Sequence, residues 1–198
     1  MYKYIIIALI LSIIFIILSS TVFKGFFGEL AVKIHLKRLI KKNNYLINNL
    51  IIEIDNKSNQ IDHIIISNKG IFCIETKNYS GTIYGDDKRK EWTQVFNYGK
   101  QKYSFYSPVI QNKNHIKALN TVFNKDYNIY NIVIFYKNQI DKIDSKYVYT
   151  IKSFKKYYNS LSNSISDLEK EEIYQLLLNI KNNQISNKQH IKNINNNK

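Results

Sequence analysis

Residues 61–81 read IDHIIISNKGIFCIETKNYSG, two runs of β-branched and other apolar residues separated by a short polar segment. The separating residues 67–70 include an asparagine and a glycine, which tolerate the positive φ angles of tight turns. Two such runs around a tight turn predict a β-hairpin. Because side chains alternate along a strand, Glu75 and Lys77 project from one face and Thr76 from the other. The second strand therefore ends with a carboxylate and an ammonium group on the same face.

An acid, Asp62, lies in the first run, and the hairpin register brings it close to Glu75. Two carboxylates buried near each other are costly unless a cation or hydrogen bonds compensate. Paired carboxylates suit Mg²⁺, which prefers oxygen ligands and keeps several waters. Lys77 can orient a water molecule or stabilise charge that develops on a phosphate. The alternative is an ordinary hairpin that ends in a solvated Glu–Lys pair.

Several separated blocks in this part of the chain agree with one family pattern in order and spacing. They resemble the nuclease-related domain (NERD), a branch of the PD-(D/E)xK nuclease superfamily, over about residues 25–125. One departure is Ser107, where the family usually has asparagine before the proline, and it concerns a turn and not a metal ligand. The matching blocks are Gly28-Glu29, Ile61–Ile64, Gly70–Phe72, Ile74–Gly81, Trp92 and Pro108–Asn112.

The resemblance implies an α/β fold with a restriction-endonuclease-like central mixed sheet flanked by helices. It also implies hydrolysis of phosphodiester bonds in nucleic acid, with DNA as the first choice of substrate and Mg²⁺ or Mn²⁺ as the cofactor. Asp62 and Glu75 would hold the metal, and Lys77 would orient the attacking water and stabilise the charge on the phosphate. Glu29 would be an accessory active-site acid, and Gln111 would position water or phosphate.

Two of these residues lie on predicted helices, where the residues alone leave their roles open. Helical periodicity over residues 28–42 puts Glu29 in a first turn, where the helix dipole favours any carboxylate. Residues 107–108, Ser-Pro, predict another helix start. Gln111 and His115 are four residues apart on that helix and share a face. A hydrogen-bonding helix side chain is the other interpretation of Gln111.

The chain is strongly basic, with a net charge of +14 over 198 residues. This charge predicts attraction to a polyanion, either nucleic acid or an anionic membrane surface. A solvated lysine-rich surface is the alternative, so charge alone does not choose between them. The single cysteine, Cys73, excludes an internal disulfide and a multi-cysteine zinc site, and its apolar neighbours predict a buried side chain.

Residues 4–23 read YIIIALILSIIFIILSSTVF and carry no charge. About 20 helical residues cross a hydrocarbon core of roughly 30 Å, so we expect one N-terminal transmembrane helix. An uncleaved anchor fits better than a signal peptide, because no Ala-x-Ala site follows the apolar run. Lysine and arginine crowd the chain after this segment, which predicts a cell-membrane location with the soluble domain in the cytoplasm.

The rest of the chain is expected to complete one domain. Residues 25–125 form the nuclease-like core, and residues 126–181 add strands and an amphipathic helix that begins at the capping box Ser166-x-x-Glu169. Residues 182–198 are rich in asparagine and lysine and are expected to be disordered. Strands are predicted at residues 45–54, 81–84, 129–136 and 147–151.

Two other functions compete with the nuclease. One is a membrane-tethered nucleic-acid-binding module that keeps the fold without turnover, and the other is a scaffold that holds anionic lipid on its basic surface. The full set of Asp62, Glu75 and Lys77 favours the nuclease, because a pure binder does not need all three. The oligomeric state is left open, with a homo-oligomer as one option.

Overall fold

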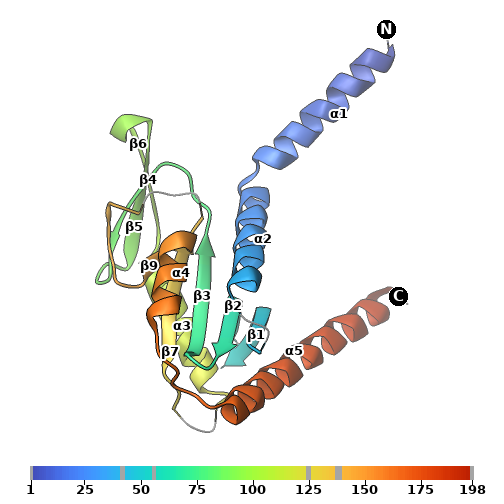
Figure 1. The fold of residues 1–198 in the computed structure, drawn as a ribbon. Helices are drawn as coiled ribbons and strands as arrows, with labels where there is room; N and C mark the ends of the chain where they lie inside the picture. The colour runs from blue at the N-terminus through green and yellow to red at the C-terminus, as the bar shows by residue number, and fades with distance from the viewer. Residues whose placement is uncertain (1, 41–42, 55–56, 124–125, 137–139, 197–198) are drawn as a thin grey trace.

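The chain forms an α/β fold, as predicted, in which a mixed sheet lies between two layers of helices (Figure 1). The computed structural model describes residues 2–40, 43–54, 57–123, 126–136 and 140–196. Its elements, in chain order, are α1 Tyr2–Ser19, α2 Thr21–Leu39, β1 Tyr45–Ile54, β2 Lys57–Ser67, β3 Gly70–Lys77, β4 Thr82–Asp86, β5 Glu91–Phe96, the 3-10 turn Asn97–Gly99, β6 Gln101–Tyr106, α3 Pro108–Asn120, β7 Ile129–Phe135, β8 Ile143–Asp144, β9 Val148–Tyr149, α4 Ile151–Ser160 and α5 Asp167–Asn196.

The main sheet has the strand order β1-β2-β3-β7-β9. The predicted hairpin is confirmed, since β2 runs antiparallel to β3 and their ladder extends from the pair His63–Ile74 to the pair Ser67–Gly70. Gly70 has φ +127°, a conformation that other residues rarely adopt, so the turn depends on glycine. β3 and β7 are parallel, and parallel neighbours need a long crossover connection, which here includes α3.

Apolar side chains on both faces of the sheet pack against the helices. On one face, α2 and α4 pack through Val32, Leu36, Phe154 and Tyr158, and Phe72 stacks on Tyr130 beneath them. On the other face, α3 and α5 pack through Ala118, Leu119, Ile173 and Leu177. Burial of each large apolar side chain adds about 1.5–3 kcal/mol to the free energy of unfolding. The strand β3 is consequently covered on both sides and forms the rigid centre of the domain.

A second sheet, with the order β6-β5-β4-β8, lies beside the main one (Figure 1). Trp92 on β5 is fully buried and stacks on Phe135 of β7 with the ring centroids 6.2 Å apart, which fastens the second sheet to the first. A Cβ atom at Gly85 would lie 2.2 Å from the Trp92 ring, so this close packing requires glycine. Trp92, one of the blocks that match the family pattern, is thus a core residue, whereas the strands β5 and β6 were not predicted.

The N-terminal prediction of one helix over residues 4–23 is wrong. The structure divides this segment at Ser20, whose side chain accepts a hydrogen bond from the backbone N–H of Phe23 at 3.2 Å and caps α2. The serine hydroxyl satisfies an N–H group that has no partner within the helix, so a new helix can start there. Of the helices within the described ranges, none is both long enough and apolar enough to cross a membrane.

The predicted disorder of residues 182–198 is also wrong up to Asn196, because α5 continues to that residue. The capping box at its start is confirmed, with the Glu169 side chain accepting from the Ser166 N–H at 3.1 Å. Gln184 makes hydrogen bonds with the backbone of Ile51 on β1, which holds the helix against the sheet edge. Such an anchor lets helix propagation, at one backbone bond per residue, extend into polar sequence. Residues 197–198 lie outside the described part.

Candidate active site

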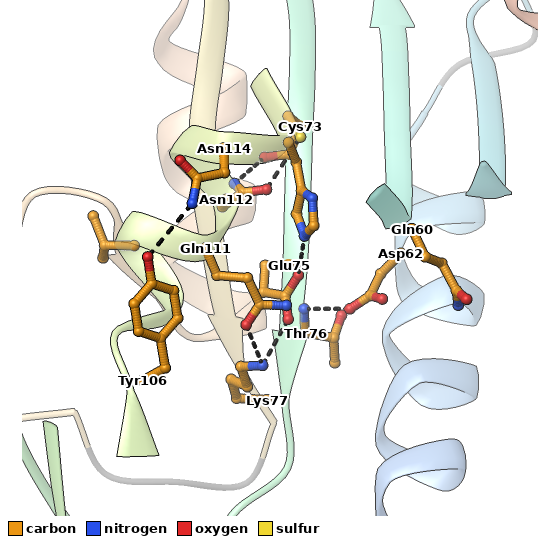
Figure 2. Close-up of polar contacts among 12 residues, drawn as sticks. Gln60, Asp62, Cys73, Glu75, Thr76, Lys77, Tyr106, Gln111, Asn112 and Asn114 are labelled. Atoms are coloured by element: carbon orange, nitrogen blue, oxygen red, sulfur yellow. Dashed lines mark hydrogen bonds and ion pairs between the residues drawn. The ribbon is translucent and has the colours of Figure 1, made fainter. Parts of the chain in front are cut away.

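The open end of the β2–β3 hairpin carries the two predicted metal ligands (Figure 2). Beyond the last ladder pair, the backbone N–H of Thr76 donates a hydrogen bond to Oδ2 of Asp62 at 2.9 Å. The Asp62 side chain therefore takes the place of a strand partner and is fixed against β3. This contact confirms the prediction that Asp62 lies near the strand that carries Glu75. The backbone bond itself was not predicted, because it depends on where the ladder stops.

Strand β1 is distorted at the position opposite Asp62. In the β1–β2 ladder, Asn48 pairs with His63 and Leu50 pairs with Ile61, but Asn49 lies between them with φ +53°. Asparagine is one of the few residues that tolerate this conformation, and strained backbone tends to cluster at functional sites. The sequence analysis missed Asn49, and an Asn-Asn pair inside an otherwise apolar strand was the available signal.

Glu75 is the most deeply buried member of the site. Its side chain is 4% exposed and that of Lys77 is 16% exposed, with Lys77 Nζ 2.6 Å from Glu75 Oε1. Lys77 Nζ also donates to Oε1 of Gln111 at 3.1 Å, so the ammonium group is held between β3 and α3 (Figure 2). The structure thus brings together Glu75, Lys77 and Gln111, as the sequence predicted.

The second oxygen of Glu75 has no hydrogen-bond partner among the described residues. Nε2 of His115 lies 3.4 Å from this Oε2, near enough for an electrostatic contact but without hydrogen-bonding geometry. Burial acts to raise the pKa of Glu75, but His115 and Lys77 outweigh it and hold the pKa below its usual value. Glu75 is therefore a carboxylate that is ionised at neutral pH, with Oε1 facing Lys77 and the buried Oε2 facing His115.

Asp62 has the opposite electrostatic character. Burial and the nearby charge of Glu75 raise its pKa to about 7, against the hydrogen bond from Thr76, which lowers it. A carboxyl group whose pKa is raised this far has too little positive charge beside it to stabilise its ionised form. Glu75, in turn, raises the pKa of Lys77 although burial of the amine opposes this. The Asp62–Glu75 pair accordingly favours the approach of a cation.

Glu29 comes from α2 and not from a helix start. The predicted first-turn position is wrong, because α2 begins at Thr21 and Glu29 lies in its interior. The charge of Glu29 is nevertheless one of the causes that raise the pKa of Asp62, so α2 brings it toward the site. Gly28 makes this approach possible, since a Cβ atom there would lie 2.4 Å from the Asn78 Cβ at the end of β3.

The helix that carries Gln111 starts as predicted, with Ser107 as its N-cap and Pro108 in its first turn. Asn112, the next residue, is fully buried and ties α3 to the centre of the sheet. Its Nδ2 donates to the Cys73 carbonyl at 2.8 Å and to Oδ1 of Asn131 at 2.7 Å. The sequence analysis did not assign a role to Asn112. A polar residue at an inward position of an amphipathic helix was the available signal.

The donor set can be compared with what a metal requires. Within the described ranges, no cluster of three or more His, Cys, Asp or Glu side chains could hold a metal ion. Mg²⁺ does not need such a cage, since it binds through one or two carboxylates and keeps waters and substrate phosphate oxygens as its other ligands. The carboxylates of Glu75 and of the charge-deficient Asp62 supply the two oxygen ligands that such a site needs. Zinc or another metal with a closed protein site fits it poorly.

Comparisons with known proteins identify the family of the chain. The family model described as the nuclease-related domain (NERD) matches residues 24–136, which include every residue of the site. An uncharacterized protein of Bacillus anthracis is 35% identical to the chain over 166 residues, which cover 79% of this chain and 76% of that protein. No solved structure matches the chain.

Proposed function

Because the chain belongs to the nuclease-related domain family, we propose that it hydrolyses phosphodiester bonds in nucleic acid, with DNA as the substrate and Mg²⁺ or Mn²⁺ as the cofactor. The family supports a nuclease-like activity. The observation that carries the rest is the buried cluster of Asp62, Glu75 and Lys77 at the open end of the hairpin. A hairpin with a purely structural role would not need a deeply buried carboxylate beside a second acid.

In this proposal, Asp62 and Glu75 hold the metal ion. The bound ion would supply positive charge that stabilises the phosphate and lowers the pKa of water. The Thr76 N–H fixes Asp62, and the contact with Lys77 fixes Glu75, so both carboxylates are oriented before any substrate arrives. Pre-orientation matters because only a site that is already arranged for the transition state lowers its energy.

Lys77 supplies a fixed positive charge at the site. Its three N–H groups serve Glu75, Gln111 and one further acceptor, for which a phosphate oxygen or the attacking water is the natural candidate. As water attacks phosphorus, the new P–O bond forms and the water gives up a proton to solvent, while the bond to the leaving oxygen breaks and that oxygen takes a proton from solvent. Negative charge grows on the phosphoryl oxygens during this exchange. The ammonium group stabilises that charge. Gln111 holds the ammonium group in place, and Glu29 adds negative charge that strengthens the attraction for metal.

DNA is proposed as the substrate because it is the first choice that the family resemblance implies, and the net charge of +14 suits any polyanion. The test incubates the full-length protein with plasmid DNA, single-stranded DNA and RNA in Mg²⁺, Mn²⁺ or EDTA. We expect metal-dependent cutting by the wild type and by Glu53→Gln, which removes an exposed acid of β1, and none by Glu75→Gln. Binding of nucleic acid without cutting in any metal would favour the module without turnover.

We also propose that the protein is located at the cell membrane, with its domain in the cytoplasm. Cell fractionation measures it directly, since a membrane-bound chain sediments with the membrane fraction and resists extraction with salt. Recovery in the supernatant after gentle lysis would contradict that prediction.

A further inference from the structure

A cleft of about 640 Å³ opens directly beside Lys77. Its walls come from three parts of the fold: the first turns of α2, the end of β3 with the segment that follows it, and the β5–β6 hairpin of the second sheet. The residues on these walls include Lys24, Thr76, Lys77, Gln94, Phe96 and Tyr103. Because Lys77 belongs both to this cleft and to the Glu75 cluster, whatever occupies the cleft lies next to the candidate metal site.

We propose that this cleft binds a single strand of nucleic acid, with unpaired bases stacked on Tyr103 and Phe96 and the backbone directed toward Lys77. The proposal rests on the proposed nuclease function and names the form of nucleic acid that reaches the site. Bases in a duplex are stacked on each other and cover their own faces, whereas the bases of a single strand offer those faces to aromatic side chains.

The aromatic wall follows from the alternation of side chains along the hairpin. Gln94 pairs with Tyr103 and Trp92 pairs with Phe105, so these four residues share one face of the β5–β6 ladder. Trp92 and Phe105 are packed into the core near the main sheet. Tyr103, farther out on the same face, is 55% exposed, and its ring meets that of Phe96 edge-on at 5.9 Å. One face of the hairpin therefore continues from the core into the cleft.

The backbone around the cleft holds this aromatic wall close to β3. Gly81, which follows β3, has φ +77°, and a Cβ atom there would lie 2.5 Å from the Val95 carbonyl and 3.0 Å from the Phe96 ring. Gln94 donates from Nε2 to the Ser80 carbonyl at 2.7 Å and joins the same two segments. The ring of Phe96 is therefore held against the segment that follows β3, in the same cleft as Lys77, as a stacking platform requires.

Polar and charged groups in the cleft suit the sugar-phosphate backbone. Lys24 and Lys77 both line it and supply two ammonium groups. The Lys24 carbonyl accepts a hydrogen bond from Asn78 Nδ2 at 2.7 Å, which ties the start of α2 to the segment after β3. The volume falls in the range of small-ligand sites, about 300–1,000 Å³, which is large enough for splayed nucleotides.

The hairpin tip extends the same surface. Asn97 and Tyr98 both have positive φ angles, 50° and 55°, and the Tyr98 ring is fully exposed. Gly99, with φ +96°, completes this tight loop between β5 and β6. The loop leaves the Tyr98 ring as a further exposed aromatic side chain on the hairpin that carries Tyr103.

The test compares binding of a fluorescent oligothymidine with binding of a hairpin duplex by anisotropy, using full-length protein in EDTA so that no cutting occurs. Tyr84→Ala is the matched control, since Tyr84 is an exposed tyrosine on the opposite face of the same sheet. We expect Tyr103→Ala to weaken oligothymidine binding about tenfold, while Tyr103→Phe and Tyr84→Ala bind as the wild type does. Duplex binding should be weaker than single-strand binding and insensitive to Tyr103→Ala.

The outcomes separate this proposal from the proposed nuclease function. If single and double strands bind equally and Tyr103→Ala matches Tyr84→Ala, the cleft does not bind a single strand, even where the metal-dependent cutting of plasmid DNA persists. If Tyr103→Ala alone loses the oligothymidine while no metal supports cutting by the wild type, the cleft binds as proposed and the nuclease function is wrong. Unchanged Trp92 fluorescence in the Tyr103 variants shows that the hairpin remains folded.

Discussion

Replacement of Lys77 by methionine removes the ammonium group that lies 2.6 Å from Oε1 of Glu75. Methionine keeps most of the side-chain length and can pack in the same space. The substitution therefore isolates the loss of charge from the loss of volume. It leaves the Glu75 carboxylate, whose side chain is only 4% exposed, without its closest cation.

The expected cost follows from the burial of the pair. Removal of one partner of a buried ion pair costs about 3–5 kcal/mol, because an uncompensated charge stays behind. The double variant Lys77→Met/Glu75→Gln removes that charge as well and should be about 2 kcal/mol more stable than Lys77→Met alone. The control is Lys142→Met, which breaks the exposed pair between Lys142 and Asp141 at 3.9 Å and should cost less than about 1 kcal/mol.

Urea unfolding measures these free energies, with the fluorescence of Trp92, the single and fully buried tryptophan, as the signal. A double variant no more stable than Lys77→Met would refute the reasoning, since it would mean that the buried carboxylate is not the source of the cost. A loss from Lys77→Met as small as that of the exposed control would refute the burial of the pair itself.

The remaining predictions concern stability and metal binding. Asn112→Ala should cost about 3 kcal/mol in the same urea titration, because it leaves the buried Cys73 carbonyl and Asn131 side chain without their donor; a loss below about 1 kcal/mol would contradict this. Burial raises the pKa of the Cys73 thiol, so a disulfide dye should label it only as the protein unfolds, and rapid native labelling would show otherwise. Mg²⁺ at a hundredfold excess over its Kd should stabilise the wild type by about 3 kcal/mol in thermal melts and leave Asp62→Asn and Glu75→Gln unchanged, whereas equal shifts in all three would place the ion elsewhere.

The sequence predicted the parts of the fold that local signals specify. The β2–β3 hairpin follows from two apolar runs around Ser67–Gly70, and its register places Asp62 near Glu75. The start of α3 at Pro108 and the capping box of α5 follow from residues that satisfy free helix N–H groups. The predicted contact of Lys77 with Glu75 needed only the alternation of side chains along one strand.

Other features depend on contacts between distant residues and have weak local signals. β6 is exposed along most of its length, so its sequence QKYSFY lacks the apolar alternation that marks a strand. The break at Ser20 lies in the hydroxyl stretch Ser19-Ser20-Thr21, and the uncharged apolar residues on both sides hide the end of one helix and the start of the next. The hydrogen bond from Thr76 to Asp62, and the approach of Glu29 to the same acid, arise only when the sheet and α2 are assembled.

The most direct test of the account is the rate of plasmid cleavage by the full-length protein as a function of Mg²⁺ concentration, for the wild type, Asp62→Asn, Glu75→Gln and the control Glu53→Gln. The account predicts saturable, metal-dependent cutting by the wild type and the control, and loss of cutting in both site variants at every metal concentration. Equal rates in all four proteins, or cutting that persists in EDTA, would contradict a metal site at Asp62 and Glu75.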